Sequence, residues 1–325
     1  MKYTRLRNLE VSRIGLGCMG MSHIYTGYKQ PEADSIAVIH RALDLGVTLI
    51  DTAELYGDGR NEELVGRAIR DRRDKVVLAT KFGLKTHTGH SIPTDSTPAN
   101  IRIAVEGSLT RLGVDHIDLY YQHRIDPLTP IEETIGALAE LITEGKIGHI
   151  GMSEAGKTNI RRANAVHPIT ALQSEYSLWT RDGDDGTLDL LRELGIGFVP
   201  YSPLGRGFLS GTIRDMDWMY EDDWRRSNPR FLPDVFEHNV AALAEVEAIS
   251  EEVGCTPSQL ALAWLLNKGA DWSPIPGTVQ IAHLEENVAA VDVVLTPNQV
   301  SRLDACTQPK GDHHGATQMK MLDRA

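Results

Sequence analysis

The sequence predicts a single (β/α)8 barrel, and two observations carry this prediction. Short apolar segments alternate with helical segments eight times, which is the pattern of a parallel sheet whose strands are each followed by a helix. The 325 residues also have one composition throughout, without a linker rich in Pro, Gly or Ser. We therefore expect residues 1–325 to form one barrel domain, with the site at the carboxyl ends of the strands.

The elements expected from the hydrophobic pattern begin with a hairpin, residues 3–6 and 11–14, which could plug one end of the barrel. The eight expected barrel strands are residues 14–17, 47–51, 76–81, 117–123, 147–153, 170–174, 197–201 and 272–276. Helices are expected to start near residues 31, 64, 97, 129, 157 and 187. Short links between these elements favour a barrel over a two-domain enzyme.

One motif would predict a different fold. Residues 15–20 have the G-x-G-x-x-G spacing of a Rossmann dinucleotide loop. That loop requires a helix that opens at the third glycine, so that its N-terminus meets the pyrophosphate. Residues 21–30 show no helical apolar period, and the next helix begins only near Pro31. We therefore interpret residues 14–17 as the first short barrel strand.

The second half of the chain holds three further features. Thr256 with Gln259, and Thr296 with Gln299, have the spacing of capping boxes, and the second predicts an accessory C-terminal helix outside the barrel. Residues 211–237 are long, aromatic and charged, which is typical of a lid, although an ordered insertion would show the same composition. The tail at 310–325 has little apolar content, so we expect it to be loosely held.

Composition and charge limit the function. The formal net charge is −12 and the isoelectric point is near 5.5, which argues against a nucleic-acid partner because phosphate binding needs clustered Lys and Arg. The three cysteines are widely spaced and predict neither disulfides nor a zinc site. No segment has the apolar length of a signal peptide or a membrane span. We expect a cytoplasmic protein that acts on small molecules, and the sequence leaves its oligomeric state open.

Chemically useful side chains end three successive strands. Asp51, Lys81 and His123 occupy these positions, and Tyr56 lies in the loop after Asp51. Taken alone, each residue has an ordinary structural interpretation. Asp51 could cap a helix, Lys81 could be solvated, His123 could be a core histidine, and the Tyr56 ring could simply pack in its loop. Together they favour proton transfer, because Tyr titrates near pH ~10 and donates best when a cation such as Lys81 lowers its pKa. We expect Asp51 to hold the lysine and His123 to orient the substrate oxygen, and no metal ligands compete for these residues.

Several motifs carry a family resemblance. The stretches DTAELYG with Asp51 and Tyr56, ATKFG with Lys81, and DLYYQH with His123 resemble the aldo-keto reductase superfamily. GMSE, ALQSEYS, FVPYSPLGRGFLSG and PIPGT also resemble its cofactor-site segments, in the same order. The resemblance implies an NADPH-dependent reductase of aldehydes or ketones, with Tyr56 as general acid and NADH as a weaker alternative coenzyme.

The resemblance also implies cofactor contacts. Tyr201 would stack on the nicotinamide, Ser153 and Gln173 would hydrogen-bond its carboxamide, and a glycine-rich bend would approach the pyrophosphate. The full implied set is Met19, Asp51, Ser153, Gln173, Tyr201, Ser202, Leu204, Gly205, Gly207, Gly277, Thr278, Gln280, His283, Glu286 and Asn287.

This chain departs from the family pattern at two places. Relatives commonly have Asn where Glu154 stands, and basic residues where Val279 and Gln280 stand. Without those basic residues we expect a smaller preference for NADPH, to which His283 can contribute a partial positive charge. A second function also stays open: a non-catalytic or regulatory barrel that binds the nicotinamide cofactor. The complete set of Asp51, Tyr56, Lys81 and His123 favours turnover.

Overall fold

The parallel strands of the barrel follow one another in chain order. The computed structural model describes residues 1–22, 25, 29–84 and 94–324, and its main sheet has the order β3-β4-β5-β6-β7-β8-β9, with every pair parallel. The strands are β3 (Leu16–Gly17), β4 (Leu49–Asp51), β5 (Val77–Phe82), β6 (Ile117–Gln122), β7 (Ile147–Ser153), β8 (Ala171–Glu175) and β9 (Gly197–Tyr201). The predicted barrel class is confirmed, as a nearly closed sheet of seven strands.

The eighth predicted strand, residues 272–276, is not a regular strand. Ser273 and Ile275 donate backbone hydrogen bonds to β9, at 3.0 Å each. On the other side, the backbone N–H groups of Gly15 and Gly17 donate to the carbonyls of Pro274 and Pro276. The segment therefore lies between the first and last strands, where the eighth strand of a closed barrel belongs. It forms only isolated bridges, because the two prolines lack the N–H that a continuous ladder needs.

Two glycines of the Rossmann-like motif, Gly15 and Gly17, allow the barrel to close at this segment. A Cβ on Gly15 or on Gly17 would stand 2.9 Å from an atom of Ile275, so only glycine lets the segment approach. After them comes the short 3-10 helix η1 (Met19–Met21), not the helix that a dinucleotide loop requires. The decision against a Rossmann fold is confirmed.

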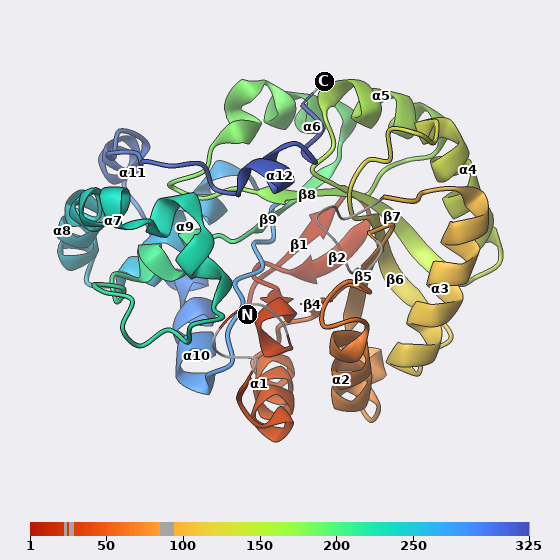
Figure 1. The fold of residues 1–325 in the computed structure, drawn as a ribbon, viewed down its shortest axis with the longest axis horizontal. Helices are drawn as coiled ribbons and strands as arrows, with labels where there is room; N and C mark the ends of the chain where they lie inside the picture. The colour runs from red at the N-terminus through yellow and green to blue at the C-terminus, as the bar shows by residue number, and fades with distance from the viewer. Residues whose placement is uncertain (23–24, 26–28, 85–93, 325) are drawn as a thin grey trace.

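Helices cover the outside of the sheet. Figure 1 shows α1 to α6 around the strands in chain order, and most of the apolar core lies between these two layers. Thr97 caps α3, and both predicted capping boxes are present at the starts of α9 and α11. No helix within the described residues is long and apolar enough to cross a bilayer. The helix bounds are α1 (Glu32–Asp44), α2 (Arg60–Ile69), α3 (Pro98–Leu112), α4 (Ile131–Thr143), α5 (Lys157–Val166), α6 (Thr187–Leu194), α7 (Pro233–Ala241), α8 (Ala244–Val253), α9 (Pro257–Lys268), α10 (Ile281–Ala289), α11 (Pro297–Asp304) and α12 (Ala316–Met319).

The N-terminal hairpin fills the end of the barrel where the strands begin. It consists of β1 (Tyr3–Leu6) and β2 (Leu9–Ser12), and it lies at the centre of the ring of helices in Figure 1. Leu6 is fully buried, and a Cβ on Gly197, the first residue of β9, would stand 2.6 Å from its Cα. The second hairpin strand starts two residues earlier than predicted, because Arg7 adopts a left-handed conformation (φ 57°) and the turn needs only two residues.

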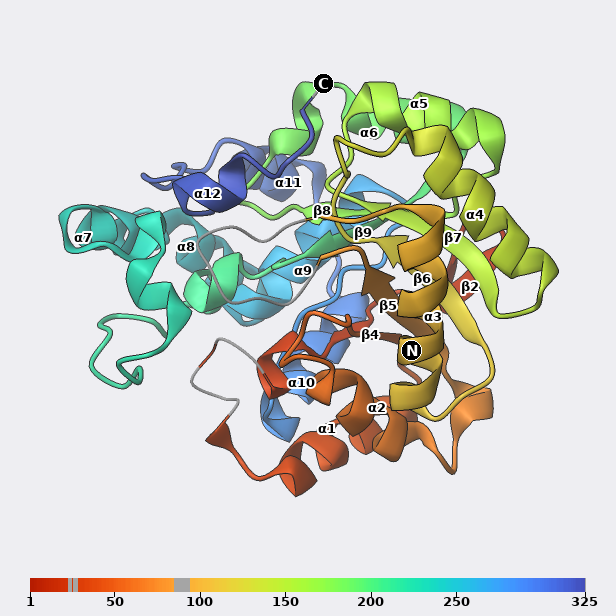
Figure 2. The same cartoon turned by 45° about the vertical axis from the view of Figure 1, so that its right-hand side comes forward.

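The segment at 211–237 is ordered. It contains the 3-10 helices η6 (Trp224–Ser227) and η7 (Pro229–Phe231), and it leads into α7, which lies with α8 beyond the ring of helices in Figures 1 and 2. The Phe231 side chain is fully buried, with its ring centroid 4.5 Å from that of Phe208. The segment therefore has the order expected of an insertion, and closure over a cofactor stays a prediction.

The C-terminal tail is also held, contrary to expectation. Asn228 donates to the carbonyl of His313 at 2.9 Å, and the carboxylate of Asp323 accepts from the backbone of Gly156 at 2.9 Å. Polar contacts to distant segments tie the tail down, and Leu322 is also buried. Composition alone does not reveal such contacts.

Candidate active site

The candidate catalytic side chains form one layer above the inner core of the barrel. Five inward positions of that core lie in successive or neighbouring strands: Leu49, Ala79, Tyr121, Ala171 and Val199. Two residues further along the same strands, or just after them, stand Asp51, Lys81, His123, Gln173 and Tyr201. Because strand side chains alternate between the two faces, all five also point inward, at the carboxyl end of the barrel.

The Lys81 ammonium is the centre of the site. It donates to Asp51 Oδ1 at 2.5 Å, to the carbonyl of Thr52 at 2.7 Å and to Tyr56 Oη at 3.3 Å, so all three of its donors are used. Its side chain is 1% exposed and that of Asp51 is 4% exposed. Burial alone would lower the pKa of Lys81, but the nearby Asp51 and Tyr56 outweigh burial and raise it. The lysine therefore stays charged.

Tyr56 and His123 face each other across the site. Their ring centroids are 6.0 Å apart, with the rings nearly perpendicular. Burial raises the pKa of Tyr56, and Lys81 opposes this effect without reversing it, so the expected net lowering was wrong. Burial, together with the charges of Arg124 and Lys81, holds the pKa of His123 well below its usual range. At neutral pH the site thus presents a protonated phenol and a neutral imidazole.

Two residues that the family resemblance implies as ligands of the carboxamide, Gln173 and Ser153, are hydrogen-bonded to side chains in or near the ion pair. Gln173 donates to Asp51 Oδ2 at 2.8 Å, which connects β8 to the ion pair. Ser153 accepts a hydrogen bond of 3.1 Å from Arg124, a residue that the sequence reasoning missed. The available signal was its position directly after His123, at the end of a barrel strand. Met19 lies in η1, immediately after Cys18, whose backbone N–H donates to the carbonyl of Asp51 at 2.9 Å.

The bend after β9 has an unusual backbone. Ser202, Gly205, Arg206 and Gly207 all have positive φ, at 48°, 55°, 60° and 100°. Leu204 accepts the backbone hydrogen bond of Gly207 at 3.0 Å, which closes the bend. Left-handed residues in succession turn backbone groups toward one side, and such a concavity suits a phosphate.

Below this bend lies a buried cluster that the sequence did not suggest. Glu175, His313 and His314 have ligand atoms within 4.8 Å of one another, the spacing of a metal site. Arg206 already supplies the positive charge, because its guanidinium donates to Glu175 at 2.6 Å. Burial and the nearby arginines lower the pKa of His313 to about 3 and that of His314 to about 2. We read the cluster as a hydrogen-bonded anchor for the tail, with His314 3.2 Å from the Tyr201 hydroxyl.

The residues implied for the adenosine end surround the start of α10. Gly277 bridges to Gly17 of β3, which places this turn beside the first strand. Thr278 Oγ1 accepts from the backbone of Gln280 at 3.1 Å, while Gln280 and His283 have exposed side chains.

Two other residues of this set, on α10, are engaged in packing. Glu286 accepts from the Thr256 hydroxyl at 2.6 Å, and its carbonyl accepts from Gln259, so it fastens α10 to the cap of α9. Asn287 is buried.

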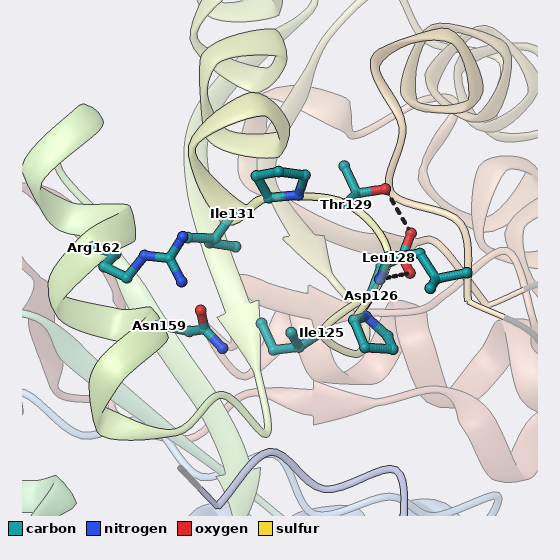
Figure 3. A pocket seen from close by; sticks show the side chains of 9 residues that line it. Ile125, Asp126, Leu128, Thr129, Ile131, Asn159 and Arg162 are labelled. Atoms are coloured by element: carbon teal, nitrogen blue, oxygen red, sulfur yellow. Dashed lines mark hydrogen bonds between the residues drawn. The ribbon is translucent and has the colours of Figure 1, made fainter.

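A surface hollow of about 330 Å³ is separate from the candidate catalytic residues. It is formed by the loop after β6 and by α5, and Figure 3 shows the Asp126 carboxylate bonded to the Thr129 hydroxyl (2.8 Å) beside it. None of Asp51, Tyr56, Lys81 and His123 lines it. We assign it no role in the reaction.

Comparison with known proteins agrees with this fold. The chain resembles the glycerol dehydrogenase AKR11B4 from Gluconobacter oxydans, with a TM-score of 0.85 and 30% identity over 93% of this chain and 94% of that one. It also resembles Tm1743, a thermostable aldo-keto reductase solved with the inhibitor epalrestat, at a TM-score of 0.76 and 30% identity over 94% and 99% of the two chains. The aldo-keto reductase AKR11C1 from Bacillus halodurans gives a TM-score of 0.73 and 28% identity over 98% and 99%. The model of the aldo/keto reductase family matches residues 13–308, and the chain belongs to this family of oxidoreductases.

Proposed function

We propose that this protein is an NADPH-dependent reductase that converts aldehyde or ketone carbonyls to alcohols, with Tyr56 as general acid. The observation that carries the proposal is the Lys81 ammonium, hydrogen-bonded to both Asp51 and the Tyr56 hydroxyl in a buried site. Family membership supports carbonyl oxidoreduction on small molecules, and the residues supply the roles. Free thiols at all three cysteines fit the proposed cytoplasmic location.

The chain's own residues handle the proton. As negative charge develops on the carbonyl oxygen, the Tyr56 hydroxyl gives up its proton, and the tyrosinate that remains is stabilised by Lys81, 3.3 Å away. Asp51 balances the lysine and fixes its position. His123 Nδ1 is buried without a hydrogen-bond partner among the described residues, so we assign its proton to Nε2, which can donate to the substrate oxygen.

The residues at the strand ends fit a nicotinamide cofactor. NADPH, when bound, supplies hydride transfer to the carbonyl carbon. Tyr201 offers a flat ring at the end of β9, and Gln173 on β8 and Ser153 on β7 offer amide and hydroxyl groups. The bend at 202–207 offers backbone to the pyrophosphate. NADH is the weaker alternative coenzyme. The preference for NADPH should be small, because Gln280 at the start of α10 carries no charge for the 2′-phosphate.

The alternative of a non-catalytic nicotinamide-binding barrel has weaker support. A sensor needs only the cofactor contacts, whereas this chain also keeps a buried ion pair that reaches the Tyr56 hydroxyl. Burying two charges lowers stability because both lose their hydration, and a role in proton transfer explains why the chain keeps them buried.

A substrate panel tests the proposal. Aldehydes, α-dicarbonyls and ketones are assayed with NADPH and with NADH, using the parent protein and Tyr56→Phe. We expect turnover by the parent with NADPH, and a loss of roughly 10²–10⁴-fold in Tyr56→Phe, because the ring stays while the proton donor is removed. Cofactor binding by the variant, followed by fluorescence, should be kept. Parent-like turnover in Tyr56→Phe would show that another group donates the proton.

A further inference from the structure

Arg124 stands beside the proposed reaction centre with an incompletely used guanidinium. It directly follows His123 and is partly exposed. A single nitrogen, Nη1, makes all of its hydrogen bonds, to the carbonyl of His123 at 2.7 Å and to Ser153 Oγ at 3.1 Å. Throughout the described chain, no further acceptor and no carboxylate partner is found for its Nε and Nη2. The Nε–Nη2 edge, which can bind a carboxylate with two parallel hydrogen bonds, is therefore open.

Three other arginines on this side of the barrel are paired with a carboxylate or use all of their nitrogens. Arg206 is paired with Glu175 at 2.6 Å, and Arg225 is paired with Asp223 at 2.8 Å. Arg230 uses all three of its nitrogens on Gly311, Thr180 and Trp179. These three arginines hold the tail and the segment at 211–237 in place. Arg124 differs because, among the described residues, it has no carboxylate partner and uses only one of its three nitrogens.

The charge of Arg124 reaches the reacting groups. It is among the causes that lower the pKa of His123, after burial, and it opposes the burial that raises the pKa of Tyr56. In a chain of net charge −12, a cation at this position runs against the overall charge and attracts anions locally. Its contact with Ser153 places it beside a residue proposed to bind the nicotinamide carboxamide.

We propose that Arg124 selects carbonyl substrates that also carry a carboxylate, which it binds through its Nε–Nη2 edge while Tyr56 and His123 engage the carbonyl oxygen. This inference rests on the proposed reductase function and names its substrate class. A bound carboxylate supplies the acceptors that the protein does not, and a charge-assisted pair at a partly buried residue such as Arg124 is stronger than one at an open surface.

The test compares two pairs of aldehydes, each an acid and its uncharged methyl ester. 3- and 4-Carboxybenzaldehyde and their methyl esters are assayed with NADPH, using the parent, Arg124→Met, Arg124→Lys and the control Arg161→Met. Arg161 lies on α5, paired with Glu193 at 2.8 Å on the surface, so its replacement removes the same charge elsewhere. We expect the parent to prefer the acid, mainly through KM. The acid-to-ester ratio of kcat/KM should fall about 10- to 100-fold in Arg124→Met, partly recover in Arg124→Lys, and stay unchanged in Arg161→Met.

The other outcomes are decisive as well. Reduction of the esters with no preference for the acids, or an equal ratio in parent and Arg124→Met, overturns the role of Arg124 and leaves the reductase proposal intact. Weaker NADPH binding in Arg124→Met with an unchanged ratio would make it a cofactor ligand instead. Failure of the parent to reduce any of the aldehydes overturns the proposed function and this inference with it. If circular dichroism shows Arg124→Met to be unfolded, Arg124→Gln replaces it under the same expectation.

Discussion

At the scale of single residues, the site depends on one buried positive charge that is fully hydrogen-bonded. A lysine inside a protein is stable in its charged form only when its partners replace the lost water, and Asp51, Thr52 and Tyr56 do this for Lys81. The sequence predicted Asp51, Lys81, Tyr56 and His123 from their positions after strands. It did not predict that the pKa of Tyr56 is raised, because the direction depends on burial, which spacing does not reveal.

The pKa shifts predict a broad pH plateau. Reduction needs protonated Tyr56 and neutral His123. The pKa of Tyr56 is raised from its ordinary 10.0, so the phenol keeps its proton to higher pH, and the pKa of His123 is lowered from 6.5, so the imidazole is already neutral there. We expect kcat/KM for a neutral aldehyde to stay flat from pH 6.5 to 10.0, measured with NADPH in excess of its binding constant. A decline that begins near pH ~8 would contradict these assignments.

The coenzyme preference also depends on single residues. Gln280 is exposed at the start of α10 and carries no charge, whereas a 2′-phosphate is best held by Arg or Lys. We expect Gln280→Arg to tighten NADPH binding about tenfold and to leave NADH binding unchanged. The dissociation constants can be measured by fluorescence titration.

The control for this variant is Ile103→Arg, which adds the same charge on α3 at a residue that is 73% exposed. It should alter neither dissociation constant. If Gln280→Arg has no effect and the parent already binds NADPH far more tightly than NADH, another basic residue holds the phosphate.

At the scale of elements, the sequence correctly predicted several strand bounds and helix caps, because interactions between neighbouring residues determine these features. Both ends of β7 match the expected range, α6 begins at the expected residue, and Thr97, Thr256 and Thr296 cap the helices that follow them. The prediction failed where distant segments decide the conformation. Residues 272–276 lie against β3 and β9 without forming a ladder. The tail is fixed by Asn228 and Gly156, which lie far away in the sequence.

The segment at 211–237 combines an anchored part with an exposed one, which favours a lid. Phe231 is fully buried, whereas Trp218 is 51% and Tyr220 is 49% exposed. We expect NADPH to increase the protection of backbone amides across Trp218–Phe231, as measured by hydrogen exchange. Protection in α6, which lies outside the proposed cofactor contacts, should not change. Identical exchange across Trp218–Phe231 with and without NADPH would rule out the lid.

At the scale of the whole molecule, the two ends of the barrel serve different purposes. The carboxyl ends of the strands hold the ion pair and the proposed cofactor contacts, where polar groups are buried at a cost in stability. The opposite end is closed by the hairpin, whose Leu6 and Val11 join the inner core with Leu49 and Val199. Mutations at the hairpin should therefore change stability without changing the chemistry.

Leu6→Ala tests this separation. Leu6 is fully buried inside the barrel, so its truncation leaves a cavity and should lower the free energy of unfolding by roughly 2–5 kcal/mol. We expect Tm to fall by several degrees in a thermal melt, while kcat/KM at 25 °C stays within about twofold of the parent. Leu128→Ala is the matched control, because Leu128 is 90% exposed and the same truncation there should change stability by less than ~0.5 kcal/mol. A large loss of activity in folded Leu6→Ala, with Tm unchanged, would mean that the hairpin communicates with the site across the inner core.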